Sequence, residues 1–489
     1  MTSLWLDRSS AVETDPFEPE SRWDIAVIGA GLTGLVTGLL FARAGRRVVV
    51  LEAREVGAVA TGNTTAKLSL LQGSHLSGIL RHSTRSTAQA YVDANREGME
   101  WLLRYCAEHG VPVQRQDAYS YAPTVNEMQR VDEEFRAATA LGLDVELTTA
   151  LPVPFPAASA VRLPGQAQFD PMDVLSALAA DFRSHGGTLV EGVRATGVRA
   201  SSPARVRTGR GIAWADRVVL ATGTPFLGRG LYFAKTEARR SYAMAFRVPG
   251  EVPDGMYLSV GRPTRSVRWT PVDGERRLLV GGDGHPVGRT VPSDHVDALL
   301  EWTADHFPGA ELTHSWSAQD YSSASGIPFV SWMPRSRRRV YLATAYGKWG
   351  MTNAVSSALT LAADILGGNL PWATKLHRRV TTLPDVGTVL GANTAVGVAA
   401  VRGWAGAWLQ TPPSTAPLEG HGSVTHEGLR PVGIATVDGV ICSVSAICPH
   451  LFGVVGWNDV EQSWDCPLHG SRFSATGERL EGPAVDDLW

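Results

Sequence analysis

A glycine-rich turn between two short apolar runs most constrains the fold of this chain. The run at residues 25–28 ends at Gly29-x-Gly31-x-x-Gly34, a helical pattern follows, and a second apolar run ends at Glu52. Glycines at this spacing let the backbone turn and approach a pyrophosphate at the helix N-terminus, and the carboxylate after the second strand can bind ribose hydroxyls. The segment therefore predicts a βαβ unit of a Rossmann-like α/β domain that binds a dinucleotide.

The dinucleotide is predicted to be FAD. A dissociable nicotinamide would require a second fingerprint of this kind for a flavin, and the sequence contains none. Residues 215–223, ADRVVLATG, instead look like the strand that returns beneath the first βα turn in flavoproteins.

Further FAD contacts are expected from two segments. The loop at 57–73 is rich in small and hydroxyl residues, whose backbone N–H groups and hydroxyls suit anionic oxygens. The turn at 346–352 precedes a helix whose N-terminus suits the electron-rich end of a reduced flavin. The predicted cofactor-binding residues are Gly29, Gly31, Leu32, Thr33, Gly34, Glu52, Ala53, Thr61, Asn63, Thr64, Thr65, Ala195, Thr222, Gly223, Gly347, Lys348, Trp349, Gly350, Met351 and Thr352.

A second cofactor is predicted near the C-terminus. Cys448-Pro-His450 is followed after fifteen residues by Cys466-Pro-Leu-His469, so two short loops each offer one thiolate and one imidazole. Such a set suits a two-iron, two-sulfur cluster in which both cysteines hold one iron and both histidines hold the other. A Cys2His2 zinc site is the alternative, and the C-x-H spacing of the first pair disfavours it.

With Gly470, Ser471 and Phe473, this segment resembles a Rieske domain. Rieske loops favour a proline after each cysteine, as found here. Histidine ligands raise the cluster potential to about −150 to +300 mV, against about −400 mV for plant-type clusters, so the cluster should accept single electrons. Respiratory-type relatives carry a bracing disulfide where this chain has Gly453 and Leu468, and a middling potential is therefore expected.

Composition places the chain among ordinary globular proteins. Its 489 residues are enough for about three domains, and 19% charged and 44% apolar residues are unremarkable values. A net charge of −3 gives no basic field for nucleic acid. Beyond the two predicted ligands only Cys106 and Cys442 remain, which fits a reducing compartment, and residues 1–22 lack the apolar run of a signal peptide. The expected location is the cytoplasm.

The predicted domains follow in order. Residues 1–22 form an extension and 23–380 the FAD domain, with helices at 83–110 and 170–182 and a strand at 188–195. Short strands from residue 240 onward predict an antiparallel substrate-binding insertion at about 235–335. Residues 381–415 form a helical linker that docks the C-terminal domain, with peripheral membrane contact as the alternative. Residues 416–489 form the small all-β Rieske domain.

The FAD segments together resemble the D-amino-acid-oxidase-like FAD-dependent oxidoreductases, and more narrowly their bacterial members fused to a C-terminal Rieske domain. The resemblance runs from Ser3 to Gly482. Many relatives place an Asp where this chain has Ser325, so any role of that Asp in the pocket does not carry over.

The resemblance implies a dehydrogenase that oxidises an amine, N-alkyl amine or amino acid by hydride transfer to FAD, with electrons leaving through the cluster to an external one-electron acceptor protein. Lys348 is the predicted charge near the flavin ring. The pocket candidates are Tyr242, Trp269, His285 and Tyr321. Two alternatives stay open: a donor protein feeds the cluster and FAD performs a reduction or oxygenation, or the protein is a redox sensor or carrier.

Overall fold

Apolar runs from both halves of the chain form a mostly parallel sheet. The computed structural model describes residues 1–379, 382–410 and 415–489. Its first sheet has the order β16-β17-β10-β1-β2-β7, and β8 and β9 extend it beside β10. The strands are β1 (Arg22–Ile28), β2 (Val48–Leu51), β7 (Thr188–Val190), β8 (Ala195–Arg199), β9 (Ala204–Thr208), β10 (Gly211–Leu220), β16 (Phe329–Trp332) and β17 (Val340–Thr344). The carboxyl ends of the parallel strands β1, β2, β7, β10 and β17 meet at one edge, where a Rossmann-like sheet binds its ligand, whereas β9 and β16 run antiparallel to their neighbours.

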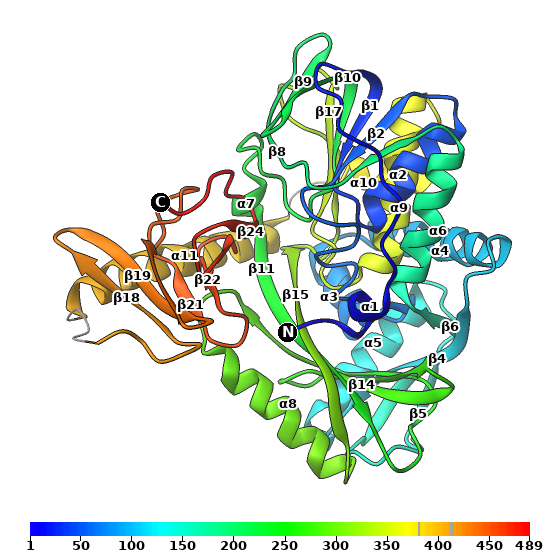
Figure 1. Ribbon diagram of the computed structural model, residues 1–489. Coiled ribbons are helices and arrows are strands. Elements are labelled where there is room, and N and C mark those ends of the chain that lie inside the picture. The colour runs from blue at the N-terminus through cyan, green and yellow to red at the C-terminus, as the bar shows by residue number, and fades with distance from the viewer. Residues whose placement is uncertain (380–381, 411–414) are drawn as a thin grey trace.

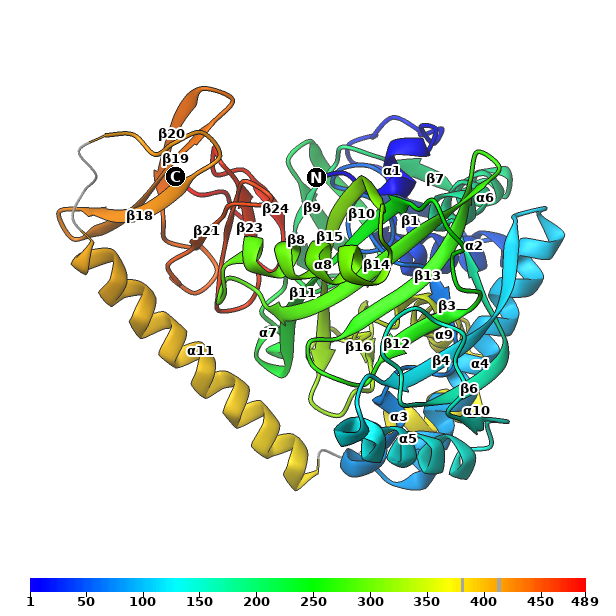
Figure 2. The same cartoon turned by 90° about the horizontal axis from the view of Figure 1, so that it is seen from below.

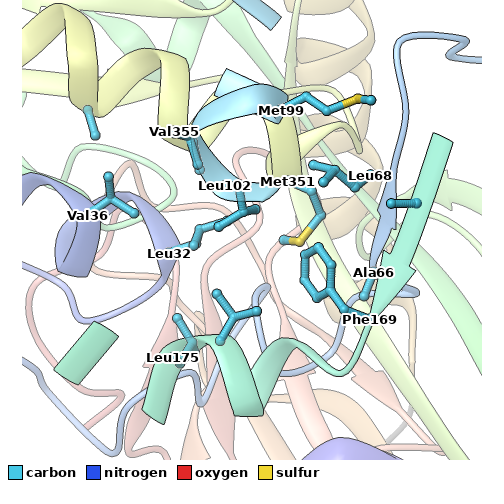
Figure 3. Close-up of a cluster of buried hydrophobic side chains, with 14 of the residues drawn as sticks. Leu32, Val36, Ala66, Leu68, Met99, Leu102, Phe169, Leu175, Met351 and Val355 are labelled. Atoms are coloured by element: carbon cyan, nitrogen blue, oxygen red, sulfur yellow. The ribbon is translucent and has the colours of Figure 1, made fainter. Parts of the chain in front are cut away.

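Helices cover this sheet and close the core. α2 (Leu32–Arg43) follows the glycine turn directly, and α9 (Gly350–Leu366) packs beside it. Figure 3 shows Leu32 and Val36 of α2 meeting Met351 and Val355 of α9, and all four are buried in the largest apolar cluster. The other helices are α1 (Leu4–Arg8), α3 (His75–His82), α4 (Arg85–Glu108), η1 (Val125–Glu127), α5 (Met128–Ala140), α6 (Pro171–Ser184), α7 (Tyr232–Lys235), α8 (Pro292–His306), α10 (Pro371–His377) and α11 (Leu383–Leu409).

The second sheet draws on more of the chain than the insertion expected at 235–335. Its order is β15-β11-β14-β13-β12-β4-β6-β3, with β5 beside β6. Its strands are β3 (Lys67–Leu68), β4 (Val113–Ala122), β5 (Glu146–Thr148), β6 (Ser159–Phe169), β11 (Thr236–Arg247), β12 (Met256–Ser259), β13 (Arg265–Val272), β14 (Glu275–Pro286) and β15 (Glu311–Ser323). The first four precede residue 235, β16 joins the other sheet, and β12 pairs with β4 in parallel. Within the predicted insertion, the paired strands β11 to β15 are antiparallel as expected, and the sheet becomes mixed where β12 joins β4.

The strand predicted at 188–195 is wrong in extent. β7 ends at Val190, Gly192 adopts a φ of 66°, and β8 begins only at Ala195. A positive φ breaks the extended backbone, which an apolar pattern alone does not reveal. The predicted helices at 83–110 and 170–182 are confirmed as α4 and α6, the second capped by Asp170.

A long helix leads to the C-terminal domain. α11 runs beside α3 and α7 to β18 and β19 (Figure 2). Its Ala407 is buried in the C-terminal core. The expected start of this linker at residue 381 lies outside the described residues. Within the described ranges, no helix is both long and apolar enough to cross a membrane.

The C-terminal domain consists of two small antiparallel sheets. One contains β18 (Gly422–Glu427), β19 (Arg430–Val437) and β20 (Val440–Ser445), and the other contains β21 (Gly456–Asn458), β22 (Ser463–Asp465), β23 (Arg472–Ser474) and β24 (Arg479–Glu481). In Figure 1 this domain lies against β11 and α7 of the larger domain. The all-β fold predicted for the C-terminus is confirmed.

Candidate functional site

A long cavity extends from the glycine turn to the second sheet. Sixteen of the residues predicted to bind FAD line it, namely Gly29, Gly31, Leu32, Thr33, Glu52, Ala53, Thr61, Asn63, Thr64, Thr65, Ala195, Thr222, Gly223, Lys348, Gly350 and Met351. Gly34, Gly347, Trp349 and Thr352 do not line it. These sixteen come from six separate segments, so the fold itself assembles the predicted site.

The glycine turn is shaped so that side chains are excluded from it. Gly29 has a φ of 106°, and a Cβ there would lie 2.5 Å from the carbonyl oxygen of Ala221. A Cβ on Gly34 would lie 1.8 Å from the carbonyl oxygen of Gly29. Gly34 therefore serves the site indirectly, because it lets helix α2 approach the turn closely enough to direct its N-terminus at the cavity.

Polar groups converge on the same end of the cavity. The Thr61 hydroxyl accepts a hydrogen bond from the Leu32 N–H at 3.2 Å, which ties the predicted phosphate loop to the first turn of α2. The Glu52 carboxylate accepts from the N–H groups of Ala30 at 2.8 Å and Arg54 at 2.9 Å, which fixes it at the end of β2. The glycine cradle and the fixed carboxylate fit the pyrophosphate and a ribose of FAD.

A strained turn carries Lys348 into the other end of the cavity. Ala345, Gly347 and Lys348 have φ values of 68°, 56° and 73°. Left-handed backbone in non-glycine residues is uncommon and concentrates at functional sites. The Lys348 ammonium donates to the Ser241 hydroxyl on β11.

The Lys348 side chain is exposed, but the space it faces is the cavity, which protein encloses. Desolvation lowers the pKa of Lys348, and the neighbouring Asp320 carboxylate opposes that shift. Burial in turn raises the pKa of Asp320, which Lys348 partly offsets. The cavity thus holds an ammonium and a carboxyl group side by side, on the face formed by β11 and β15.

The four pocket candidates separate into two groups. Tyr242 and Tyr321 line the cavity, and desolvation raises the pKa of both phenols. His285 lies behind the wall, 3.2 Å from the Tyr242 hydroxyl, and desolvation lowers its pKa to about 4. Trp269 also stays outside the cavity, because its strand β13 is separated from β11 by β14.

The four predicted cluster ligands are brought together in two pairs. Cys448 and Cys466 are both buried and belong to the same apolar cluster of the C-terminal domain. The rings of His450 and His469 lie with centroids 5.2 Å apart, and the buried Nδ1 of His469 has no hydrogen-bond partner. Among the described residues, no three Cys, His, Asp or Glu side chains form a group suited to one metal ion. Two pairs of ligands fit two irons, whereas tetrahedral zinc would require all four at one point.

Two features of the loops around these residues bear on the predicted cluster site. The Ser471 hydroxyl is buried and accepts from the Ala484 N–H at 3.1 Å. A Cβ added at Gly453 would lie 2.6 Å from the Leu468 side chain, so the two positions that braced Rieske proteins cross-link face each other here. All four cysteines are free thiols.

The C-terminal domain forms part of the cavity wall, which the sequence did not indicate. Residues 479–482 line the cavity together with Gln319 and Asp320 of β15 and with Ser241 of β11. The one sequence feature that could have indicated this contact is the alternation of polar residues along β15. That alternation is equally typical of a strand that faces solvent. The cavity is therefore lined by the parallel sheet, by the second sheet and by the C-terminal domain.

Comparison with known proteins identifies both modules. The FAD dependent oxidoreductase family matches residues 24–364, and the Rieske [2Fe-2S] domain family matches residues 419–488. The chain belongs to the FAD-dependent oxidoreductase family. It is 31% identical over 496 residues to YhfW of Bacillus subtilis (strain 168), named as a Rieske 2Fe-2S iron-sulfur protein, with 99% of this chain and 96% of YhfW covered.

Solved structures show the same fold for the flavin module of this FAD-dependent oxidoreductase. Glycine oxidase from Geobacillus kaustophilus superposes with a TM-score of 0.61 at 19% identity, over 74% of this chain and 100% of the oxidase. L-amino acid deaminase from Proteus vulgaris superposes with a TM-score of 0.61 at 16% identity, over 76% of this chain and 100% of the deaminase.

The family assignment gives the oxidoreductase its two cofactors, FAD and a Rieske [2Fe-2S] cluster. Both fit the residues present, because the glycine cradle excludes side chains and the unpartnered imidazole nitrogen of His469 is available as a ligand. The match to the Rieske [2Fe-2S] domain family decides against the zinc alternative. The individual FAD contacts and cluster ligands remain predictions that mutagenesis can test.

Proposed function

We propose that this oxidoreductase is a dehydrogenase that oxidises an amine or amino acid at its C–N bond and passes the electrons through its Rieske domain to an external one-electron acceptor protein. FAD supplies hydride acceptance, and the cluster supplies single-electron transfer. The amine loses a hydride from carbon and a proton from nitrogen, and the resulting imine is hydrolysed by water. Two molecules of a one-electron acceptor remove the two electrons.

One observation carries this proposal. The loop that holds His469 lies directly against the cavity wall, where the Gln319 side chain donates to the Gly470 carbonyl oxygen at 2.7 Å. A redox centre placed at the wall of a flavin site is positioned to exchange electrons with it. The oxidase and deaminase named above share the fold of the flavin module, and their names support an amine-type substrate.

The chain's own residues then have the following roles. Tyr242 and Tyr321 form the wall against which the substrate lies, and the raised phenol pKa keeps both neutral. His285 fixes the Tyr242 hydroxyl from behind and acts as a positioning residue. Lys348 places a positive charge beside the ring end of the cavity, where it stabilises the negative charge that a reduced flavin carries.

Anaerobic mixing of the purified holoprotein with a panel of amino acids and N-alkyl amines tests this function. The expected result is loss of the oxidised flavin absorbance with at least one member, accompanied by a stoichiometric carbonyl product and released amine. Reduction of the cluster by a reduced ferredoxin, with no bleaching by any amine, would contradict the proposal and reverse the direction of electron flow.

A further inference from the structure

The surface between the C-terminal domain and the flavin cavity contains a continuous polar connection to a predicted cluster ligand. Gln319 lines the cavity from β15 and is 4% exposed. Its Nε2 donates to the Gly470 carbonyl oxygen at 2.7 Å and to the Tyr321 hydroxyl at 2.8 Å. Gly470 is covalently attached to His469, so one hydrogen bond joins the cavity wall to the backbone of a predicted iron ligand.

The ligand loop is pressed onto the flavin domain at this point. Gly470 has a φ of 75°, and a Cβ there would lie 2.5 Å from the Ala238 Cβ and 2.8 Å from the Gln319 Nε2. Only glycine fits so close to β11 and β15. The approach of the loop to Gln319 is therefore built into the backbone and does not depend on one side-chain rotamer.

The histidine edge of the cluster site also faces the flavin domain. The Phe233 ring of α7 meets His450 and His469 edge-on, with centroids 4.7 and 4.9 Å away. His469 is 8% exposed. Phe233 covers the imidazoles but does not line the cavity, so it does not itself connect the two sites.

Arg240 fixes which way the Gln319 amide points. Its guanidinium donates to the Gln319 Oε1 at 2.9 Å, and it is 1% exposed. A guanidinium carries only donors, so the oxygen of the amide must face it and the nitrogen must face Gly470. The Gln319 Oε1 is thus paired with Arg240 and its Nε2 with the Gly470 carbonyl, so the amide cannot flip without losing both hydrogen bonds.

We propose that Gln319 is the bridge through which electrons pass between the flavin cavity and the cluster. The route runs through the Gln319 amide, across the hydrogen bond to the Gly470 carbonyl, and along the backbone and imidazole of His469 to iron. Each passage removes one electron from the reduced flavin and reduces one ferric iron to ferrous. The second electron follows after the external acceptor has taken the first from the cluster.

This inference rests on the proposed electron exchange between FAD and cluster, but not on its direction or on the substrate. Two variants of the holoprotein distinguish loss of the Gln319–Gly470 hydrogen bond from loss of the contact between the two domains. Gln319→Glu keeps the side-chain length and the contact to Arg240, but loses the donor to Gly470. Gln319→Leu removes both contacts. Gln168→Leu is the matched control, because Gln168 is a fully buried glutamine that donates to the Trp269 carbonyl, away from the C-terminal domain.

The experiment photoreduces the flavin with a short light pulse in the presence of deazaflavin and a sacrificial donor, without any amine, and follows the cluster absorbance. Loss of the hydrogen bond replaces the 2.7 Å contact by a van der Waals gap of about 3.5–4.0 Å. Because tunnelling through space weakens steeply with distance, transfer in both Gln319 variants should be roughly tenfold slower. The midpoint potentials, the cluster spin-resonance spectrum and the solution scattering profile of Gln319→Leu should match those of Gln168→Leu. The added carboxylate of Gln319→Glu should lower the cluster potential, so its transfer rate is compared at equal driving force.

If solution scattering shows that the domains stay docked and the transfer rates of both variants are unchanged, Gln319 is not the electron bridge. If the wild-type flavin is photoreduced but its cluster never follows, the proposed electron exchange itself fails, and the bridge with it. The two failures are distinguished by the wild-type trace alone.

Discussion

Replacing Arg240 by Met should release the Rieske domain from the flavin domain. Arg240 extends from β11 into a buried group of three carboxylates that all belong to the Rieske domain, Glu461, Asp465 and Glu481. Arg472 of the Rieske domain pairs with the same three groups. Arg240 is therefore the cation that the flavin domain contributes to this group.

The size of the effect follows from the charges. Two guanidinium groups and three carboxylates give the buried group a formal charge of −1, and the variant leaves −2. Removing one partner of a buried ion pair costs about 3–5 kcal/mol, because the remaining charges stay desolvated. The carboxylates and Arg472 stay on one domain, so the loss falls on docking, whose equilibrium constant should drop by roughly 100-fold to several thousand-fold.

Differential scanning calorimetry and equilibrium dialysis of FAD measure this release. The variant should show a separate, earlier transition for one domain, and it should lose FAD more readily, because residues 479–482 line the cavity. The matched control is Arg247→Met on the same strand, whose side chain is 55% exposed and pairs with exposed carboxylates. Such pairs are worth about 0–1 kcal/mol. An Arg240→Met protein with wild-type calorimetry and FAD affinity would refute the reasoning.

Four further outcomes are expected. Burial favours a higher pKa for Glu461, but the charges of Arg240 and Arg472 outweigh burial and hold the pKa below its usual 4.5. Docking of the two domains should therefore be stable above about pH 4.5 and be lost as the pH falls further. Solution scattering between pH 3 and 7 checks this. Gly34→Ala should yield protein without FAD, visible in its absorbance spectrum, because the new Cβ would lie 1.8 Å from the Gly29 oxygen. Lys348→Met should slow flavin reduction by about 100-fold with unchanged FAD content, measured by stopped flow. Cys466→Ser should abolish the cluster absorbance and the bound iron while FAD remains.

Local patterns in the sequence predicted the parts of the site that depend on neighbouring residues. Gly29, Gly31 and Glu52 belong to one βαβ unit of about thirty residues, and their spacing alone fixes their relation to the ligand. The predicted cluster ligands Cys448 and His469 likewise belong to two adjacent loops. In such units local backbone geometry brings the predicted residues together, so a local pattern is enough to propose them, and their roles stay predictions.

Contacts between distant segments could not be predicted. Gln319 and Gly470 are 151 residues apart, and nothing in either segment marks the other as its partner. Trp269 was selected as an aromatic residue on a strand of the right sheet, but the strand order places β14 between β13 and β11. The order of strands depends on how the whole sheet packs. The alternation of apolar and polar residues within one strand does not indicate which strands are its neighbours.

The most direct test of the account is freeze-quench spectroscopy of the anaerobic holoprotein after mixing with an amine substrate, with flavin absorbance and the spin-resonance signal of the reduced cluster recorded in the same samples. We expect flavin reduction first and the cluster signal second, with one electron per protein in the cluster until an external acceptor is added. A cluster that stays oxidised while the flavin is fully reduced, or a cluster signal that precedes flavin reduction, would contradict the account.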